Sequence, residues 1–148
     1  MKSKTCILFL FTLWLSGCAS EQMNSSNDVM TATIQIDHNY EEITDYELFW
    51  ESIFDVDSTS YYVYFYSTSC NHCEELKNFI VEKALSRGDI YFVKGTSKDQ
   101  ITNDKNKTIN AEKPGDIWIL GYPTLLKITN YKCSKNVVGI SQIKDELK

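Results

Sequence analysis

Residues 61–80 read YYVYFYSTSCNHCEELKNFI, and this stretch decides the fold. Tyr61 to Tyr66 is an unbroken run of β-branched and aromatic residues, which is typical of a central strand buried on both faces. The run ends at residues 67–69, and Cys70 and Cys73 then stand at the head of an amphipathic helical pattern. The sequence therefore predicts that a strand delivers a C-x-x-C pair to a helix N-terminus, where a thiolate is readily stabilised.

The residues after the pair predict a helix followed by a second strand. Apolar residues recur on one helical face, at Leu76, Phe79, Ile80 and Ala84. Gly88 is expected to end the helix, because glycine readily adopts the left-handed conformation of a C-cap. Ile90 to Val93 has the pattern of a short buried strand. The order strand, helix, strand predicts a parallel pair with a right-handed crossover, which is the core of an α/β fold.

The flanking segments give weaker patterns. A weak alternation at 31–36 indicates a first strand, and the apolar spacing from about Thr44 to Phe54 indicates an amphipathic helix. Thr44 and Glu47 fit a capping box at its start. Residues 95–114 are polar and rich in Lys, Asn, Thr and Asp, so they predict a long loop.

The C-terminal part predicts a hairpin and a short helix. Pro123 precedes an expected strand at Thr124 to Thr129. Its antiparallel neighbour is expected at Val137 to Ile140, across a turn at 131–136. Residues 141–148 form a short helix at most.

The first residues have the pattern of a secretion signal. Lys2 and Lys4 make a basic start, and Ile7 to Leu15 make an apolar run that is too short to span a membrane. Residues 15–18 (LSGC) resemble the lipobox of bacterial lipoproteins, which implies cleavage before Cys18 and a lipid on its sulfur. The alternative is an ordinary signal peptide with an incidental cysteine.

The expected organisation is a lipoprotein signal peptide at 1–17, a lipidated cysteine and flexible tether at 18–30, and one domain at 31–148. A chain of 148 residues is long enough for one domain with a core and too short for two of typical size. The lipid predicts attachment to the extracytoplasmic face of a bacterial cell membrane. The net charge of −5 argues against nucleic acid as a partner, and a monomer is expected.

The cysteines divide by position. Cys6 would leave with the signal and Cys18 would carry the lipid, so Cys70, Cys73 and Cys133 remain in the domain. Three cysteines at these spacings do not form a disulfide scaffold of the small secreted kind. Cys133 falls in the predicted hairpin turn and is interpreted as a free thiol, with an intermolecular disulfide or a regulatory role as the alternative.

Two motifs together resemble the thioredoxin superfamily, over about Thr31 to Lys148. They are YFYSTSCNHC at 64–73 and GYPTLL at 121–126. The resemblance implies a thioredoxin-like fold, with a central mixed β-sheet flanked by helices. It also implies a cis peptide bond at Pro123, with Tyr122, Pro123 and Ser69 on the surface that binds the substrate protein.

The chemistry follows from the pair itself. The thiolate is the nucleophile, and a thiol with a pKa of about 8.5 is only a few per cent ionised at neutral pH. Cys70 is assigned as the attacking cysteine, and Cys73 resolves the mixed disulfide. His72 can stabilise the thiolate, whereas Glu74 and Glu75 oppose it as screened charges. No cofactor is expected beyond a redox-active disulfide Cys70–Cys73. The resemblance favours an oxidising protein, because family members with a histidine just before the second cysteine tend to be oxidants or isomerases.

Three departures from the family pattern are visible. Tyr64 stands where the family has a buried carboxylate that assists proton transfer to or from the second cysteine, which leaves a slower route through Tyr64 or water. Ser69 replaces the usual tryptophan, which suggests different partner recognition. The span from Cys73 to Pro123 is longer than in the most compact members, which places an insertion at about 95–114.

Other readings of the pair stay open. Cys70 and Cys73 can form a static surface disulfide, or part of a zinc site, for which only His38, His72 and Cys133 remain as further ligands. The leading hypothesis is a membrane-anchored thiol–disulfide oxidoreductase that acts on protein thiols and disulfides together with a redox partner. The alternative is a redox-inactive binding or accessory lipoprotein, for example in peptide or bacteriocin export. A reductase in cytochrome or metal-centre maturation has no feature that singles it out.

Overall fold

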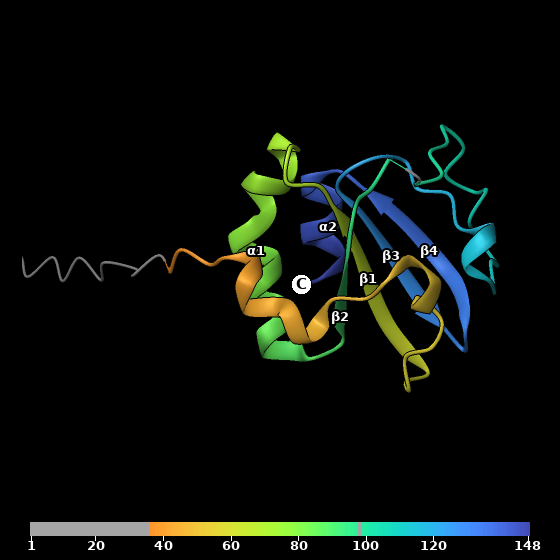
Figure 1. Cartoon of the computed structure of the whole chain (residues 1–148), viewed down its shortest axis with the longest axis horizontal. Coiled ribbons are helices and arrows are strands. Elements are labelled where there is room, and N and C mark those ends of the chain that lie inside the picture. Colours follow the sequence, from red (N-terminus) through yellow and green to blue (C-terminus); the bar gives the residue numbers. More distant parts are fainter. Residues whose placement is uncertain (1–35, 98) are drawn as a thin grey trace, which may run out of the picture. The chain divides into compact units, whose positions relative to one another are not determined.

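A four-stranded mixed sheet with the strand order β2-β1-β3-β4 is the centre of the fold (Figure 1). The computed structural model describes residues 36–97 and 99–148. The signal segment, Cys18, the tether and almost all of the weak strand expected at 31–36 lie outside the described residues. The strands are β1 (Ser60–Tyr66), β2 (Ile90–Lys94), β3 (Thr124–Thr129) and β4 (Lys132–Val138).

The predicted order of strand, helix and strand is confirmed. β1 pairs in parallel with β2, and the helix α1 (Asn71–Arg87) connects them. β3 pairs antiparallel with β1 and with β4 on its other side. Gly88 ends α1 in the left-handed conformation, with φ of 73°, and its N–H donates to the Ala84 carbonyl. The expected fold class, a mixed sheet flanked by helices, is therefore correct.

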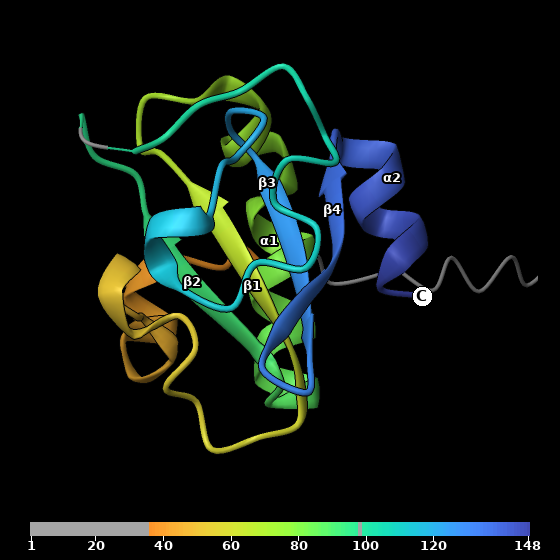
Figure 2. The same cartoon turned by 90° about the vertical axis from the view of Figure 1, so that its right-hand side faces the viewer.

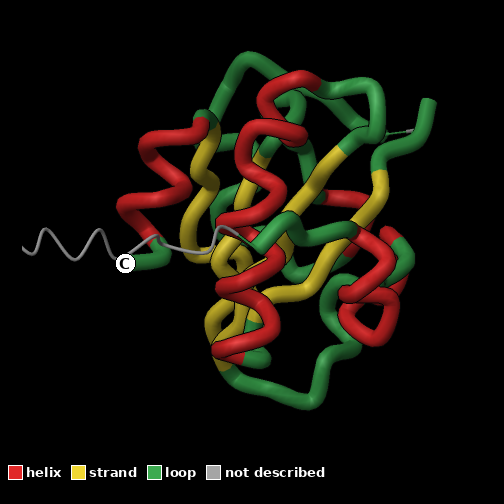
Figure 3. Tube along the Cα trace, turned by 90° about the vertical axis from the view of Figure 1, so that its left-hand side faces the viewer, coloured by secondary structure: helices red, strands yellow, loops and turns green. Residues whose placement is uncertain are grey.

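The helix side of the sheet carries most of the aromatic core. α1 and the C-terminal helix α2 (Ile140–Glu146) pack on this side together with Ile43, and Figure 3 views the molecule from here. The buried side chains of the strands on this side are Tyr62, Tyr64, Tyr66, Ile90, Phe92 and Leu125. All six residues from Tyr61 to Tyr66 are buried, as the unbroken β pattern predicts.

The opposite side of the sheet is covered by loops and short 3-10 helices (Figure 2). The predicted loop after β2 is confirmed, and the chain beyond it returns across this face with the 3-10 helix η3 (Pro114–Asp116). Ala111, Ile117 and Ile119 from this segment are buried against β1 and β3. Burial of an isoleucine is worth about 1.5–3 kcal/mol, so this segment seals the core although it has no regular secondary structure.

Two expectations about local structure are wrong. The helix expected at about Thr44 to Phe54 is instead two 3-10 helices, η1 (Tyr40–Tyr46) and η2 (Trp50–Ser52). The capping contact also lies earlier, because the Glu42 carboxylate accepts the Asn39 N–H at 2.6 Å. A parallel bridge between Glu47 and Phe92 interrupts the helical spacing and fixes this segment to the edge of β2.

The hairpin is tighter than expected, and the turn at 131–136 and the strand at Val137 to Ile140 are wrong, because β4 spans Lys132–Val138 and Ile140 begins α2. Asn130 and Tyr131 form the turn, both with positive φ, so β4 begins at Lys132. Positive φ at both central residues matches the twist of a two-residue hairpin, and asparagine tolerates it. Cys133 consequently lies within β4, buried, rather than in a turn. The short C-terminal helix is confirmed as α2.

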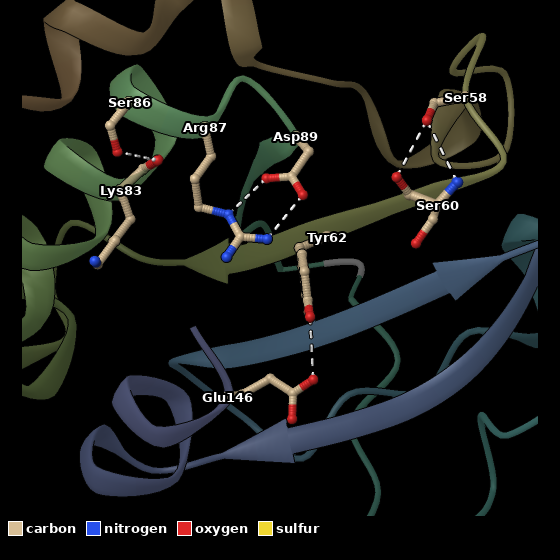
Figure 4. A network of polar contacts seen from close by, with 8 residues as sticks. All are labelled: Ser58, Ser60, Tyr62, Lys83, Ser86, Arg87, Asp89 and Glu146. Carbon is tan, nitrogen blue, oxygen red and sulfur yellow. Dashed lines mark hydrogen bonds and ion pairs between the residues drawn. The ribbon is translucent and has the colours of Figure 1, made fainter. Parts of the chain in front are cut away.

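Polar side chains tie the ends of the elements together (Figure 4). The Arg87 guanidinium donates twice to the Asp89 carboxylate, at 2.8 Å each, where α1 leads into β2. The Tyr62 hydroxyl of β1 donates to the Glu146 carboxylate of α2 at 3.1 Å. Glu146 also pairs with Lys135 on β4, so the last helix is held to two strands.

Candidate functional site

Cys70 and Cys73 form a disulfide at the N-terminus of α1. Their Cα atoms are 5.2 Å apart, one helical turn. Cys70 is the N-cap residue, and its sulfur accepts the Cys73 N–H at 3.1 Å. Cys70 is half-buried, whereas Cys73 is 1% exposed. The two cysteines thus differ in exposure: Cys70 is partly open to solvent, and Cys73 lies in the core.

The residues around the pair keep the helix N-terminus open. The Cys70 N–H donates to the Ser67 carbonyl at 3.1 Å, which turns the chain from β1 into α1. Ser69 and His72 are both exposed beside the disulfide. The Glu74 carboxylate pairs with Lys77 at 2.6 Å, so its charge opposes a thiolate less than an unpaired carboxylate would.

Pro123 lies at the same end of the sheet as the disulfide. The register pairs Thr124 with Phe65, so Pro123 continues it at the level of Tyr66, the last residue of β1. The Tyr122–Pro123 peptide bond is cis, as the resemblance implies, and Pro123 is buried. The structure therefore brings Tyr122 and Pro123 to the end of the sheet at which β1 finishes and the chain continues to Ser69 and Cys70.

Tyr122 is fixed by two contacts. Its hydroxyl donates to the Asp99 carboxylate, and burial followed by this hydrogen bond raises the pKa of Tyr122 above its ordinary value. Its ring lies so close to Gly95 that a Cβ at that position would overlap it. The absence of a side chain at Gly95 is therefore required for Tyr122 to lie where it does.

Tyr40 is a site residue that the sequence patterns miss. Its hydroxyl donates to the Cys73 carbonyl at 3.1 Å, and its ring stacks on Tyr66 at 4.1 Å between centroids. Burial raises the pKa of Tyr40 to about 12, so it stays a neutral donor. It holds the first turn of α1 against β1. A lone tyrosine 30 residues before the pair gives no local signal of this contact.

Tyr64, which replaces the expected carboxylate, is completely buried. Its hydroxyl has no hydrogen-bond partner among the described residues. The nearby Tyr40 hydroxyl donates to the Cys73 carbonyl. Burial, followed by the proximity of Tyr40, raises the pKa of Tyr64 far above its ordinary value. Tyr64 therefore cannot take up a proton as a base in the way that a carboxylate does.

Cys133 is a free thiol, buried on the far side of the sheet from α1. Its sulfur donates weakly to the Lys135 carbonyl at 3.5 Å. Burial raises the pKa of this thiol to about 12. In the described part of the chain, no group of three or more His, Cys, Asp or Glu side chains is arranged to hold a metal ion, and no helix is long and apolar enough to cross a membrane.

These features define a thioredoxin-like fold: a parallel β-α-β unit with a disulfide at the helix N-terminus, continued by an antiparallel hairpin that a proline precedes. No protein-family model and no curated protein matches the sequence.

Thioredoxins are among the solved structures to which this chain is similar. A thioredoxin of Plasmodium falciparum is 16% identical with a TM-score of 0.44, over 66% of this chain and 87% of that one. Thioredoxin f2 of Chlamydomonas reinhardtii is 17% identical with a TM-score of 0.44, over 68% and 88%. Mitochondrial thioredoxin 3 of Saccharomyces cerevisiae is 15% identical with a TM-score of 0.44, over 68% of this chain and 88% of that one.

Proposed function

We propose that this protein is a thiol–disulfide oxidoreductase that acts on protein cysteines through Cys70-Asn71-His72-Cys73. One observation carries the proposal: an accessible cysteine at the N-cap of α1 is joined to a buried cysteine one turn further on. A static surface disulfide has no need of this difference in access. The redox-active group is the disulfide itself, and no separate cofactor is proposed.

The exchange uses only sulfur atoms. A thiolate of the client attacks the Cys70 sulfur, the Cys70–Cys73 bond breaks, and Cys73 leaves as a thiolate that takes up a proton. The second client thiolate then attacks the client sulfur of the mixed disulfide, which releases reduced Cys70. The client loses two electrons and the Cys70–Cys73 pair gains them. The same steps in reverse reduce a client disulfide, and a redox partner of the thiol–disulfide class resets the pair.

The helix N-terminus favours a thiolate at Cys70. A helix dipole supplies about 0.3–1 kcal/mol, and up to about 2 kcal/mol in a partly buried site. A hydrogen bond to a charged acceptor contributes about 1.5–3 kcal/mol, and the Cys73 N–H already points at the Cys70 sulfur. These two contributions exceed the about 1 kcal/mol or less expected from an exposed charge, so we assign the exposed His72 a secondary role.

A trapping experiment tests the proposal. Cys73→Ser removes the resolving sulfur, so Cys70 should accumulate mixed disulfides with client proteins, visible as bands that a reductant removes. Cys70→Ser is the matched variant and should trap nothing, whereas Cys133→Ala should behave as the wild type because Cys133 lies on the other side of the sheet. Failure to trap any protein, together with failure to exchange with glutathione disulfide, would overturn the proposal.

We propose in addition that a lipid on Cys18 holds the domain at the extracytoplasmic face of the membrane. The basic start, the short apolar run and the LSGC motif support this location. Cys18→Ala should release the protein from the membrane fraction while the rate of exchange of the purified protein stays unchanged. Retention of this variant in the membrane fraction would contradict the anchor.

A redox-inactive binding role is the second candidate, and Tyr64 is the observation that favours it. Without a buried carboxylate, proton transfer to and from Cys73 loses its usual base. The two candidates differ in their dependence on sulfur chemistry. If the Cys70→Ala variant restores the phenotype of a deletion strain as fully as the wild type does, the binding role holds and the oxidoreductase role does not.

A further inference from the structure

A pocket opens at the carboxyl ends of β1 and β2, next to the disulfide end of the sheet. It is lined by residues 47–51, 93–96 and Asp99, and its volume is about 670 Å³. This volume lies in the usual range for ligand-binding clefts. We call it the acidic pocket. The chemistry described above does not use it.

The acidic pocket is connected to the candidate site through backbone and side chains. The Gly95 N–H donates to the Tyr66 carbonyl at 2.6 Å, so the pocket wall joins β1 at its last residue. Asp99, which lines the pocket, accepts the hydroxyl of Tyr122, the residue before Pro123. The acidic pocket is therefore joined to Tyr122, the residue that precedes Pro123, by a direct side-chain contact.

Two carboxylates of the pocket, those of Glu47 and Asp99, accept hydrogen bonds from neutral hydroxyls of described residues, and such bonds do not cancel the charge of a carboxylate. The Glu47 carboxylate accepts the Tyr66 hydroxyl at 2.7 Å. Asp99 accepts the hydroxyls of Thr96 and Tyr122. Glu51 adds a third carboxylate to the lining, and Lys94 is the one lysine among the described lining residues. The described lining residues thus carry three carboxylates and one amine, and this net negative charge is complementary to a cation.

An exposed aromatic residue stands on the rim. Phe49 is 81% exposed, and the segment that carries it is fixed, because the neighbouring Leu48 N–H donates to the Phe92 carbonyl at 2.7 Å. The indole N–H of Trp50 donates to the Pro114 carbonyl at 3.1 Å and anchors the other side. An exposed phenylalanine on a held backbone, in a lining that includes three carboxylates, offers apolar contact and charge together.

We propose that the acidic pocket binds the client polypeptide, and that it selects a segment with a lysine or arginine side chain and an adjacent apolar side chain beside the reactive cysteine. The cation lies between Glu47 and Glu51, and the apolar side chain packs on Phe49. This inference rests on the proposed oxidoreductase function and names its class of substrate.

Matched peptides test the selection with the full chain. Two dithiol peptides are compared that differ only in a lysine or a glutamate beside the cysteine. The wild type should oxidise the lysine peptide with a kcat/KM about fivefold higher or more, as expected for one or two partly exposed charge pairs. The preference should decline as salt rises through about 0.15–1 M.

Variants separate the pocket from overall charge. Glu51→Lys should abolish the preference, whereas Glu82→Lys on the exposed side of α1 makes the same change of net charge and should retain it. Phe49→Ala should raise KM for both peptides severalfold and leave kcat unchanged. Serine-substituted peptides, which cannot exchange, should show the same order of affinity by calorimetry.

Exchange with glutathione disulfide distinguishes failure of the pocket assignment from failure of the oxidoreductase function. Normal exchange with glutathione but equal rates with both peptides overturns the pocket assignment and leaves the oxidoreductase function in place. No exchange with glutathione or with either peptide overturns both. If Glu51→Lys instead dissociates a dimer in gel filtration, the pocket is a surface for a second copy of this chain, and the client assignment is wrong.

Discussion

Two neighbouring tyrosines of β1 provide a sharp test of how this core is built. Tyr61 and Tyr64 are both completely buried, on opposite sides of the sheet. The Tyr61 hydroxyl donates to the Ile53 carbonyl at 2.7 Å, whereas the Tyr64 hydroxyl has no partner among the described residues. Removal of one oxygen atom from each should therefore change the free energy of unfolding with opposite sign.

The magnitudes follow from hydrogen bonding and packing. A buried hydroxyl without a partner costs about 1–3 kcal/mol, so Tyr64→Phe removes this cost. The void left by one oxygen, at about 24 cal/mol per Å³, costs a few tenths of a kcal/mol. We expect Tyr64→Phe to stabilise the protein by about 1 kcal/mol. Tyr61→Phe loses a hydrogen bond and leaves the Ile53 carbonyl unpaired, so it should destabilise the protein by about 1–2 kcal/mol.

Urea and thermal unfolding of the oxidised proteins measure the difference. For a domain of this size the two variants should differ in Tm by about 10 °C, with Tyr64→Phe above the wild type and equal m-values throughout. Tyr62→Phe, whose hydroxyl is only partly buried against Glu146, should lie between them. If Tyr64→Phe lowers the free energy of unfolding as much as Tyr61→Phe does, the Tyr64 hydroxyl is bonded and the reasoning fails.

The same variant addresses proton transfer. Burial raises the pKa of the Tyr64 hydroxyl far above its ordinary value, so the hydroxyl is protonated at neutral pH. It cannot serve as the base for Cys73, so Tyr64→Phe should leave the rate of thiol–disulfide exchange within about twofold of the wild type. A loss of tenfold or more would show that the hydroxyl relays the proton without ionising.

Three further predictions concern the rest of the domain. Burial raises the pKa of Cys133 to about 12, so iodoacetamide at pH 8 should modify Cys70 and spare Cys133 in the folded reduced protein; rapid labelling of Cys133, located by peptide mass spectrometry, would contradict its burial. The Arg87 hydrogen bonds hold the pKa of Asp89 below its ordinary value of 3.8, so the stability they give is present above that pH and is lost as the pH falls through the lowered folded-state pKa. Asp89→Asn should therefore cost up to about 1 kcal/mol at pH 7 and nothing in strong acid; an equal cost at both pH values would exclude the charge as the cause. Gly88→Ala should destabilise by about 1–2 kcal/mol from its positive φ alone, because a Cβ meets no atom there, while Gly115→Ala, with equal space and ordinary φ, should not.

The core of the fold is predictable because its sequence signals are local. The unbroken β run before Cys70 and the glycine at 88 mark a strand and a helix without reference to the rest of the chain. The strand after Pro123 is equally clear, and its bounds at Thr124–Thr129 are as expected. These elements place the disulfide and the proline at one end of the sheet.

The errors arise where distant contacts override local spacing. Apolar residues near Leu48 and Ile53 repeat as in a helix, but the backbone of Glu47 pairs with Phe92, 45 residues away, and a helix cannot form through that bridge. Tyr40 likewise belongs to the site only through the hydrogen bond from its hydroxyl to the Cys73 carbonyl, and no sequence spacing predicts that contact. Sequence patterns therefore predict most helices and strands of this chain, but they do not predict contacts between residues that are far apart in the sequence.

The segment from Gly95 to Tyr122 contributes to the core although most of it is irregular. Thr108 fixes its middle, because its hydroxyl donates to the Trp118 carbonyl and accepts the Trp118 N–H. Its far part closes the second face of the sheet, and its two ends meet where Tyr122 packs on Gly95 and binds Asp99. A substitution at Gly95 would therefore displace Tyr122, and with it Pro123 and the wall of the acidic pocket. Under the proposed function, we expect such a variant to change the rate of exchange and the preference among peptides together.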